Sequence, residues 1–369
     1  MPASMLAGCE AVQYLIDRQL INSSCCLSDK IRVRSASRRH HNFHVTGLSG
    51  GDYFLKQGKH SVDVGSIANE AHAYTAILGQ DSHARMRKYL PAVRDYDETR
   101  GIITLEAIPH AQDLEHYHTQ TRRFPKTVAK SIGTALGILH DSTFAWSTRK
   151  GAEPKLTKVL PTVFNLRHPP LDILKTSSGV CLELIKLFQR HTQFGDELEA
   201  LSKSWKAETV IHGDLKLSNF VTYKKKPHAR ISGVKLVDWE FAGLGDPHWD
   251  VGSVFNSYLA LWILSVPIAK HDRPDELLNL ALFPLERIQP SFRIFWETYC
   301  KTRGLYGQKA QTWLYHATRL AAVCLVQTAY EYAKNANYLT AEIVTMMQVS
   351  LNMFLRPDQA AIHLLGIDG

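Results

Sequence analysis

The sequence predicts an α+β protein with two lobes, a small β-rich N-terminal lobe over residues 1–108 and a large, mainly helical C-terminal lobe over residues 109–369. Alternating apolar and polar residues, which are typical of strands, are concentrated in the first of these segments. Helical spacing of apolar residues dominates from Phe124 onward. A chain of 369 residues is also too long for one small core, which favours two lobes.

The N-terminal segment contains strand-like stretches and one helix. Residues 66–78 are predicted to be helical, because Ile67, Ala71, Tyr74 and Leu78 recur at helical spacing. Turn signals such as the "LSGG" stretch separate the strands. The predicted strands are residues 30–37, 42–47, 52–58, 92–98 and 101–108.

The C-terminal segment is predicted to be helical except for one β-hairpin. Pro125 sits where a first helical turn accepts proline, and apolar residues then share one face as far as Leu139. Residues 220–223 and 234–240 flank a Lys-rich turn, which indicates a hairpin with a solvated tip. The apolar run 258–269 is too short to cross a bilayer and is expected to form a buried helix, and residues 312–332 form a further core helix.

Composition and charge narrow the class of protein. Hydrophobic residues make up 45% and charged residues 21% of the chain, as in ordinary globular proteins. The net charge is +8, but the basic residues are spread along the chain without an aromatic-interleaved stripe or zinc-finger spacing, so we expect a solvated basic surface and no nucleic-acid partner. The start of the chain lacks the pattern of a secretory signal, and six cysteines are scattered without CxxC spacing. We therefore expect a cytoplasmic protein with reduced, mostly buried cysteines and no membrane partner.

One loop contains an unusual set of polar residues. The stretch "VIHGDLKLSNFVTY" (210–223) places His, Gly, Asp and Asn between buried segments. Gly, Asp and Asn are also common in purely structural turns. In a phosphoryl-transfer site, however, Asp214 would reach the acceptor hydroxyl, while Asn219 and the strand-end Asp238 would supply the oxygen ligands that Mg²⁺ prefers.

The ordered motifs "HGDLKLSN" (212–219) and "VDWEFAGLGDPHWDVG" (237–252), after a β-rich start, resemble the aminoglycoside phosphotransferase and choline kinase-like family, relatives of protein kinases. The resemblance spans nearly the whole chain and implies a protein-kinase-like fold that uses ATP and Mg²⁺. It implies that Asp214 is the catalytic base or orients the acceptor hydroxyl, that Asn219 and Asp238 hold Mg²⁺, and that His212 is structural. Asp250 would brace the catalytic loop and Asp246 would help form the turn, although both carboxylates could instead cap the start of a helix.

The same resemblance assigns nucleotide contacts in the N-terminal lobe. Lys56 lies inside an apolar strand, where an unpaired ammonium group is costly, so Glu70 of the following helix is its expected partner. In kinase-like folds such a pair places the α- and β-phosphates of the nucleotide. The alternative is an edge-strand Lys and a solvated Glu. The adenine would lie against the connection after the last strand, with backbone hydrogen bonds between Glu106 and Ile108.

The loop between the first two strands departs from the glycine-rich pattern of many nucleotide-binding loops. It reads "SASRRHHN" (35–42), so side chains such as Ser37 and Arg38 would take over phosphate contacts that glycine-rich loops make with backbone amides. The alternative is a basic, exposed hairpin tip.

The acceptor is open at this stage. Basic residues outnumber acidic ones between Ser142 and Arg190, which argues for a neutral or anionic acceptor unless these lysines only coat helix surfaces. The first hypothesis is a kinase of a hydroxyl-bearing small molecule or antibiotic. The second is a Ser/Thr-peptide kinase in lanthipeptide-type biosynthesis, which would need a separate lyase partner. The third is a non-catalytic nucleotide-binding module.

Overall fold

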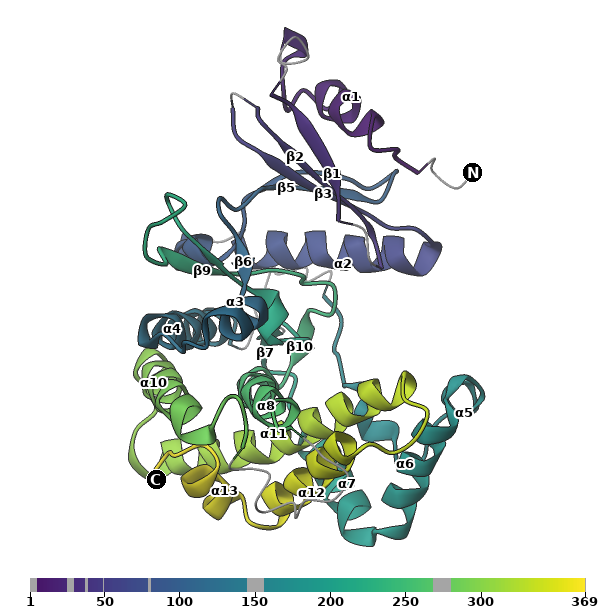
Figure 1. Cartoon of the computed structure of the whole chain (residues 1–369), viewed down its shortest axis with the longest axis vertical. Helices are drawn as coiled ribbons and strands as arrows, with labels where there is room; N and C mark the ends of the chain where they lie inside the picture. Colours follow the sequence, from purple (N-terminus) through teal and green to yellow (C-terminus); the bar gives the residue numbers. More distant parts are fainter. Residues whose placement is uncertain are drawn as a thin grey trace. The chain divides into compact units, whose positions relative to one another are not determined.

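A five-stranded antiparallel sheet forms the N-terminal part of the protein, in the order β1-β2-β3-β5-β4 (Figure 1). The strands are β1 (Arg32–Ser35), β2 (His41–Thr46), β3 (Tyr53–Gln57), β4 (Val93–Asp97) and β5 (Ile102–Glu106). Four of them lie within the stretches predicted from sequence alternation, and β2 begins one residue before its predicted stretch 42–47. Pairs such as Phe43 with Leu55, and Lys56 with Ile103, fix the register of β3 between β2 and β5.

The computed structural model describes most of the chain, namely residues 5–24, 30–36, 39–48, 50–78, 81–144, 156–267 and 280–368. Two compact units result. The smaller comprises Met1–Leu114, Glu153–Thr157 and Asn219–Gly243, and the larger comprises Glu115–Ala152, Lys158–Ser218 and Leu244–Gly369. The predicted division into lobes 1–108 and 109–369 stays a prediction, because these units do not correspond to a single cut in the chain.

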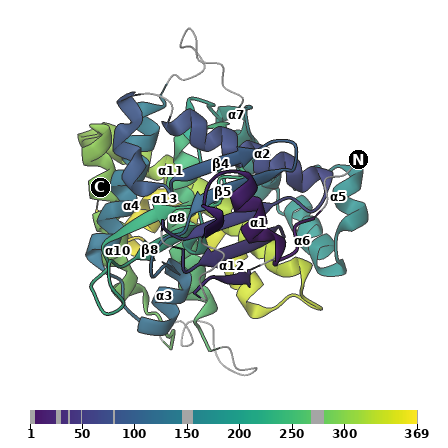
Figure 2. The same cartoon turned by 90° about the horizontal axis from the view of Figure 1, so that it is seen from above.

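A helix covers each face of the five-stranded sheet. Successive side chains of a strand point to opposite faces, so both faces carry side chains that a helix can bury. The helix α1 (Glu10–Asp17) packs Tyr14 and Leu15 into a core cluster with Phe43 and Leu55, and Figure 1 and Figure 2 both show it lying against the strands. Lys56, the neighbour of Leu55, faces the other way, toward α2 (Ser61–Leu78). The two helices thus bury opposite faces of the same strands.

A second, three-stranded sheet belongs to the smaller unit, in the order β6-β8-β9. Its strands are β6 (Gln112–Asp113), β8 (Phe220–Tyr223) and β9 (Gly233–Leu236). The last two form the predicted hairpin, with Phe220 opposite Leu236 and Tyr223 opposite Gly233. The 3-10 helix η2 (Asp81–Tyr89) precedes β4, and Lys235 of β9 donates a hydrogen bond to the carbonyl oxygen of Leu90 at 2.8 Å.

The larger unit is mainly helical and contains a two-stranded sheet of β7 (Thr209–Ile211) and β10 (Gly243–Gly245). Its helices are α3 (Leu114–Thr121), α4 (Lys126–Ser142), α5 (Leu171–Thr176), α6 (Gly179–Arg190), α7 (Thr192–Ser204), α8 (Pro247–Leu264), α10 (Leu285–Arg303), α11 (Gly307–Lys334), α12 (Ala341–Leu355) and α13 (Pro357–His363), with 3-10 helices η4 (Thr162–Asn165) and η5 (Leu217–Asn219). This arrangement confirms the predicted fold class, a small β-rich part followed by a large helical part.

Two helix pairs of the larger unit position the loop that follows β7. The helix α4 approaches α10 closely, since a Cβ added at Gly133 would lie 2.4 Å from the carbonyl oxygen of Phe295. The helix α8 packs against α11 in the same way, and a Cβ at Gly252 would lie 2.7 Å from the amide nitrogen of Ala321. These glycines allow the backbones to come closer than side chains would permit.

The sequence-based expectations about burial are borne out where the structure describes them. Cys181, Cys300 and Cys324 are buried and reduced, Cys9 is reduced but exposed, and Cys25 and Cys26 lie outside the described residues. Of the predicted buried helix 258–269, the part from Tyr258 to Leu264 forms the second half of α8, which ends there, and residues 268 and 269 lie outside the described residues. Across the described ranges, no helix combines the length and apolarity that a membrane span requires.

Candidate active site

The loop after β7 is held by the carboxylate of Asp250. Its Oδ2 accepts a hydrogen bond from the amide of His212 at 2.8 Å, and its Oδ1 accepts one from the amide of Gly213 at 3.1 Å. Gly213 has φ +82°, in the left-handed region that favours glycine. The indole of Trp249 donates to the carbonyl oxygen of Gly213 at 3.0 Å. The start of α8 therefore fixes both the backbone conformation and the direction of the loop that carries Asp214.

The structure separates the two roles that the sequence left open for Asp246 and Asp250. Asp246 is the N-cap of α8, and its Oδ1 accepts from the amide of His248 at 3.0 Å. Asp250 lies in the first turn of that helix but uses its oxygens on the loop. The first carboxylate is a helix cap and the second is the brace.

A buried chain of hydrogen bonds supports Asp250 from behind. His140, near the end of α4, places Nε2 3.2 Å from Asp250 Oδ2 and Nδ1 3.0 Å from the hydroxyl of Tyr299. Burial lowers the pKa of His140, although the neighbouring Asp250 carboxylate opposes that shift. With a neutral ring, the network assigns the proton to Nε2, which donates to Asp250, while Nδ1 accepts from Tyr299. The loop brace thus extends to α4 and α10.

Asp214 follows this braced turn and forms an ion pair with Lys216. Lys216 Nζ lies 2.8 Å from Asp214 Oδ2, and the Asp214 side chain is 21% exposed, so solvent reaches the carboxylate. The neighbouring His212 is fully buried, consistent with a structural role. A carboxylate on a fixed turn beside an exposed ammonium group can orient a hydroxyl group and accept its proton.

Within the smaller unit, Lys56 lies between two carboxylates. Its Nζ donates to Glu70 Oε2 at 2.7 Å and also forms an ion pair with Asp238 Oδ1. Lys56 is 5% exposed and Glu70 is 1% exposed. Burial alone would lower the pKa of Lys56, but the charges of Glu70 and Asp238 outweigh it and raise the pKa above its ordinary value. The predicted Lys–Glu pair is therefore present, and the ammonium group stays charged.

Asn219 and Asp238 lie at the same end of the β8–β9 hairpin. The amide of Val237 donates to the carbonyl oxygen of Asn219 at 3.1 Å, which extends the pairing of Phe220 with Leu236 by one residue. Asp238 has φ +68°, a left-handed conformation that is uncommon for residues other than glycine. Such backbone outliers cluster at functional sites. Its side chain is 33% exposed.

Two of the three backbone amides in the expected adenine-binding connection already have partners within the protein. Glu106 donates its backbone N–H to Ala92 at 2.8 Å, and Ala107 donates to Asp52 at 2.9 Å. The side chain of Glu106 pairs with Arg94 at 2.6 Å. Among the described residues the amide of Ile108 has no such backbone partner. Its contact with the adenine stays a prediction.

The part of the basic loop that the structure describes binds acidic side chains. Arg39 lies 3.2 Å from both Asp63 and Glu240, and His40 Nε2 lies 2.9 Å from the hydroxyl of Ser66. Burial, followed by the positive charges of Lys56 and Arg39, lowers the pKa of His40 to about 4. Arg39 is therefore engaged within the unit. Ser37 and Arg38, the predicted phosphate-binding residues, lie outside the described residues.

The basic character of the segment from Ser142 to Arg190 is partly compensated from outside that segment. Arg167 pairs with Asp196 at 2.8 Å and with Glu199 at 3.1 Å, and both acids belong to α7. Arg149, Lys150 and Lys155 lie outside the described residues. Charge counting in this segment is accordingly a weaker guide to the acceptor than the sequence alone indicated.

Sequence reasoning missed three contributors to these contacts. Lys216 could have been found from its position two residues after Asp214 in the same loop. His140 and Glu240 carried no local signal, because their partners Asp250 and Arg39 are 110 and 201 residues away along the chain.

The family model described as "Phosphotransferase enzyme family" matches residues 30–273. This is more than half of the chain, and the chain therefore belongs to the phosphotransferase enzyme family. It is a phosphotransferase of the kinase type with a hydroxyl group as acceptor, which confirms the resemblance and the enzyme class predicted from the motifs.

Solved structures agree on the fold. An ethanolamine kinase from Plasmodium vivax is similar at 12% sequence identity, with 95% of this chain and 88% of that chain covered and a TM-score of 0.57. A choline kinase from Cryptosporidium parvum is similar at 12% identity, with 95% and 96% covered and a TM-score of 0.55. At this identity the likeness shows the fold alone. No curated protein matches this chain.

Proposed function

We propose that this enzyme transfers the γ-phosphoryl group of ATP to a hydroxyl group of a small molecule, with Mg²⁺ held by Asn219 and Asp238. The observation that carries the proposal is the buried Lys56, which Glu70 and Asp238 keep charged and fixed. A fixed ammonium group at this position can bind the α- and β-phosphates of a nucleotide.

The donor set fits Mg²⁺. Asn219 and Asp238 offer amide and carboxylate oxygens, the hard ligands that this ion prefers. They stand at one end of the hairpin, and the partly exposed carboxylate of Asp238 is accessible from solvent. When bound, the ion neutralises charge on the phosphates. The left-handed backbone of Asp238 supports this role, because it directs the side chain differently from the strand that precedes it.

Asp214 is proposed as the residue that orients the acceptor hydroxyl and accepts its proton. Its turn is fixed by Asp250 before any substrate arrives, so little reorganisation is needed at the moment of transfer. Lys216, which pairs with Asp214, is proposed to stabilise negative charge on the transferred group. Ile108 is proposed to donate a hydrogen bond to the adenine from its backbone.

Amino alcohols are the first acceptors to test, since two proteins of the same fold are kinases of ethanolamine and choline. Sugars, aminoglycosides and Ser-containing peptides complete the panel. The peptide-kinase hypothesis with a lyase partner gains no support from the described contacts, because Arg167 is paired with acids of its own unit. It is retained only as an arm of the experiment.

The experiment measures ADP release by the full chain with MgATP and each acceptor, together with the melting temperature with ATP in the presence and absence of Mg²⁺. We expect acceptor-dependent ADP release by the parent and loss of release in Asp214→Asn, which should still melt higher with MgATP. Asp238→Asn should lose the Mg²⁺-dependent rise. Parent-like release by Asp214→Asn would refute its role, and nucleotide binding without release for any acceptor would favour the non-catalytic module.

A further inference from the structure

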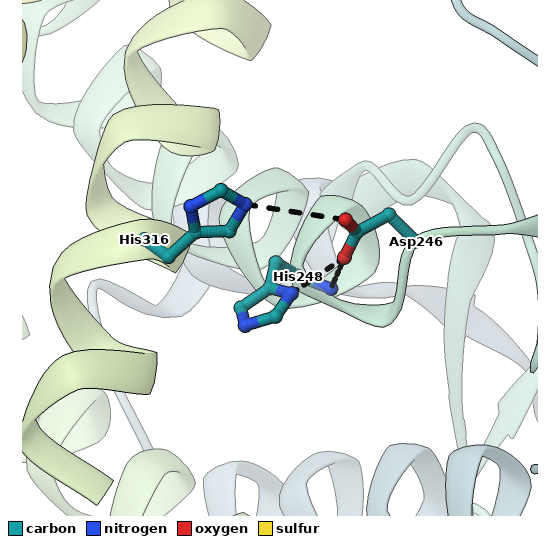
Figure 3. Close-up of side chains that lie close together, drawn as sticks. All are labelled: Asp246, His248 and His316. Atoms are coloured by element: carbon teal, nitrogen blue, oxygen red, sulfur yellow. Dashed lines mark hydrogen bonds and ion pairs between the residues drawn. The ribbon is translucent and has the colours of Figure 1, made fainter. Parts of the chain in front are cut away.

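One cluster in the larger unit is not used by the proposed phosphoryl transfer. Asp246, His248 and His316 bring one carboxylate and two imidazole groups together, with one ligand atom from each residue lying within 4.8 Å of the others. His248 Nδ1 lies 2.5 Å from Asp246 Oδ1, and His316 Nε2 lies 3.9 Å from Asp246 Oδ2 (Figure 3). Asp246 and His248 stand at the start of α8, and His316 projects from α11.

The two oxygens of Asp246 have different tasks. Oδ1 caps α8 by accepting from the amide of His248 at 3.0 Å. Oδ2 makes longer contacts with described residues, at 3.4 Å to the amide of Lys206 and 3.9 Å to His316 Nε2. The carboxylate can therefore keep the helix cap while its second oxygen binds a cation.

Aromatic packing holds both imidazole rings in place. His248 stacks on Trp313 with ring centroids 3.8 Å apart and an interplanar angle of 26°, and it meets the edge of His316 at 4.4 Å. Trp313 and His316 are three residues apart on α11, so they lie on one face of that helix. The histidine side chains are 19% and 25% exposed, which leaves a route from solvent.

The carboxylate of Asp246 is 3% exposed, and a buried charge requires compensation. Among the described residues, the ion-pair partners of Asp246 are His248 and His316, and neither a Lys nor an Arg pairs with it. The N-terminus of α8 supplies part of the compensation. A bound divalent cation would supply the remainder.

We propose that Asp246, His248 and His316 form a binding site for a divalent transition metal ion of the Zn²⁺ type, separate from the Mg²⁺ that accompanies ATP. Two imidazoles and one carboxylate suit Zn²⁺ better than Mg²⁺, and three protein ligands leave a fourth position for water. Zn–N and Zn–O bonds of about 2.0–2.2 Å place tetrahedral donors about 3.3 Å apart. The contact of 3.9 Å between His316 Nε2 and Asp246 Oδ2 is somewhat longer than that spacing, and one ligand atom of each of the three residues lies within 4.8 Å of the others, so small side-chain rotations would complete the site. The bound ion would tie the start of α8 to α11.

The test titrates the chelator-treated full chain with Zn²⁺ and follows heat of binding and melting temperature, with Co²⁺ as a spectroscopic probe of tetrahedral coordination. His316→Gln and His248→Gln each remove one ligand and keep the Asp246 helix cap. His363→Gln is the matched control, because His363 is an exposed histidine at the end of α13.

We expect the parent and the control to bind one equivalent of Zn²⁺ and to melt higher with it. Each ligand variant should bind at least ~100-fold more weakly, since even the outer partners of zinc ligands are worth about 10–100-fold in affinity. If a ligand variant fails to fold, binding of Zn²⁺ by the parent still tests the proposal. Absence of one tight equivalent in the parent, or equal binding by the parent and a folded ligand variant, would overturn the proposal.

Discussion

Replacing Asp250 by Asn should loosen the loop that carries Asp214 without unfolding the protein. Asp250 is fully buried and accepts from the amides of His212 and Gly213 and from His140. Asn keeps one oxygen and places an NH₂ group where the second oxygen stood. That NH₂ group would face an N–H donor, so at least one hydrogen bond is lost.

The magnitude follows from these contacts. Hydrogen bonds to a charged group contribute ~1.5–3 kcal/mol and neutral ones ~0.5–1.5 kcal/mol. In Asp250→Asn one hydrogen bond is lost and the remaining ones no longer involve a charged group, which lowers the free energy of unfolding. The variant also no longer buries a charge, which offsets part of this decrease. We expect the free energy of unfolding to fall by about 2–4 kcal/mol, which a domain of ~5–15 kcal/mol survives.

Two measurements check this expectation. Urea unfolding gives the free energy of unfolding, and hydrogen exchange gives the protection of the amides of His212 and Gly213. The control is Asp196→Asn, an exposed carboxylate whose pairing with Arg167 is worth ~0–1 kcal/mol. If Asp250→Asn keeps both the amide protection and the unfolding free energy of the parent, the bracing role is wrong.

Three further predictions concern charge. Lys216→Met should lower kcat about 100-fold with little effect on unfolding, because its exposed ammonium lies beside Asp214; an unchanged kcat would contradict this. Lys56→Met should lower the free energy of unfolding by about 3–5 kcal/mol, because it leaves the carboxylate of Glu70 buried without its partner. The double variant Lys56→Met with Glu70→Met should regain part of that free energy. If Lys56→Met alone is as stable as the parent in urea, this prediction is wrong. Burial lowers the pKa of His118 to about 4, although its bond to a backbone carbonyl opposes the shift. The unfolded chain therefore takes up this proton first, and His118 contributes stability above pH ~6.5 that is lost as the pH falls toward 4. Unfolding free energies of His118→Gln should fall less steeply than those of the parent over that range, and parallel profiles would exclude the effect.

Local patterns predicted the strands, the α2 helix and the loop of Asp214, because periodicity and motif spacing depend on neighbouring residues. The Lys56–Glu70 pair was predictable for the same reason, since the two residues are 14 apart on adjoining elements. The His140–Asp250 contact was not, because it depends on how α4 packs against other helices. The same holds for Arg39, whose partner Glu240 comes from a hairpin far along the chain.

The smaller unit is assembled from segments that the ribosome makes at different times. Lys56 and Glu70 are synthesised long before Asp238, and Asn69 caps the carbonyl groups of Glu240 and Ala242, at 2.9 and 2.8 Å, only once that hairpin exists. Domains generally fold as units during synthesis, N-terminal ones first. During synthesis Lys56 therefore has Glu70 but not Asp238 as a partner, and the charge compensation of this buried ammonium group is completed only after the β8–β9 hairpin has been made.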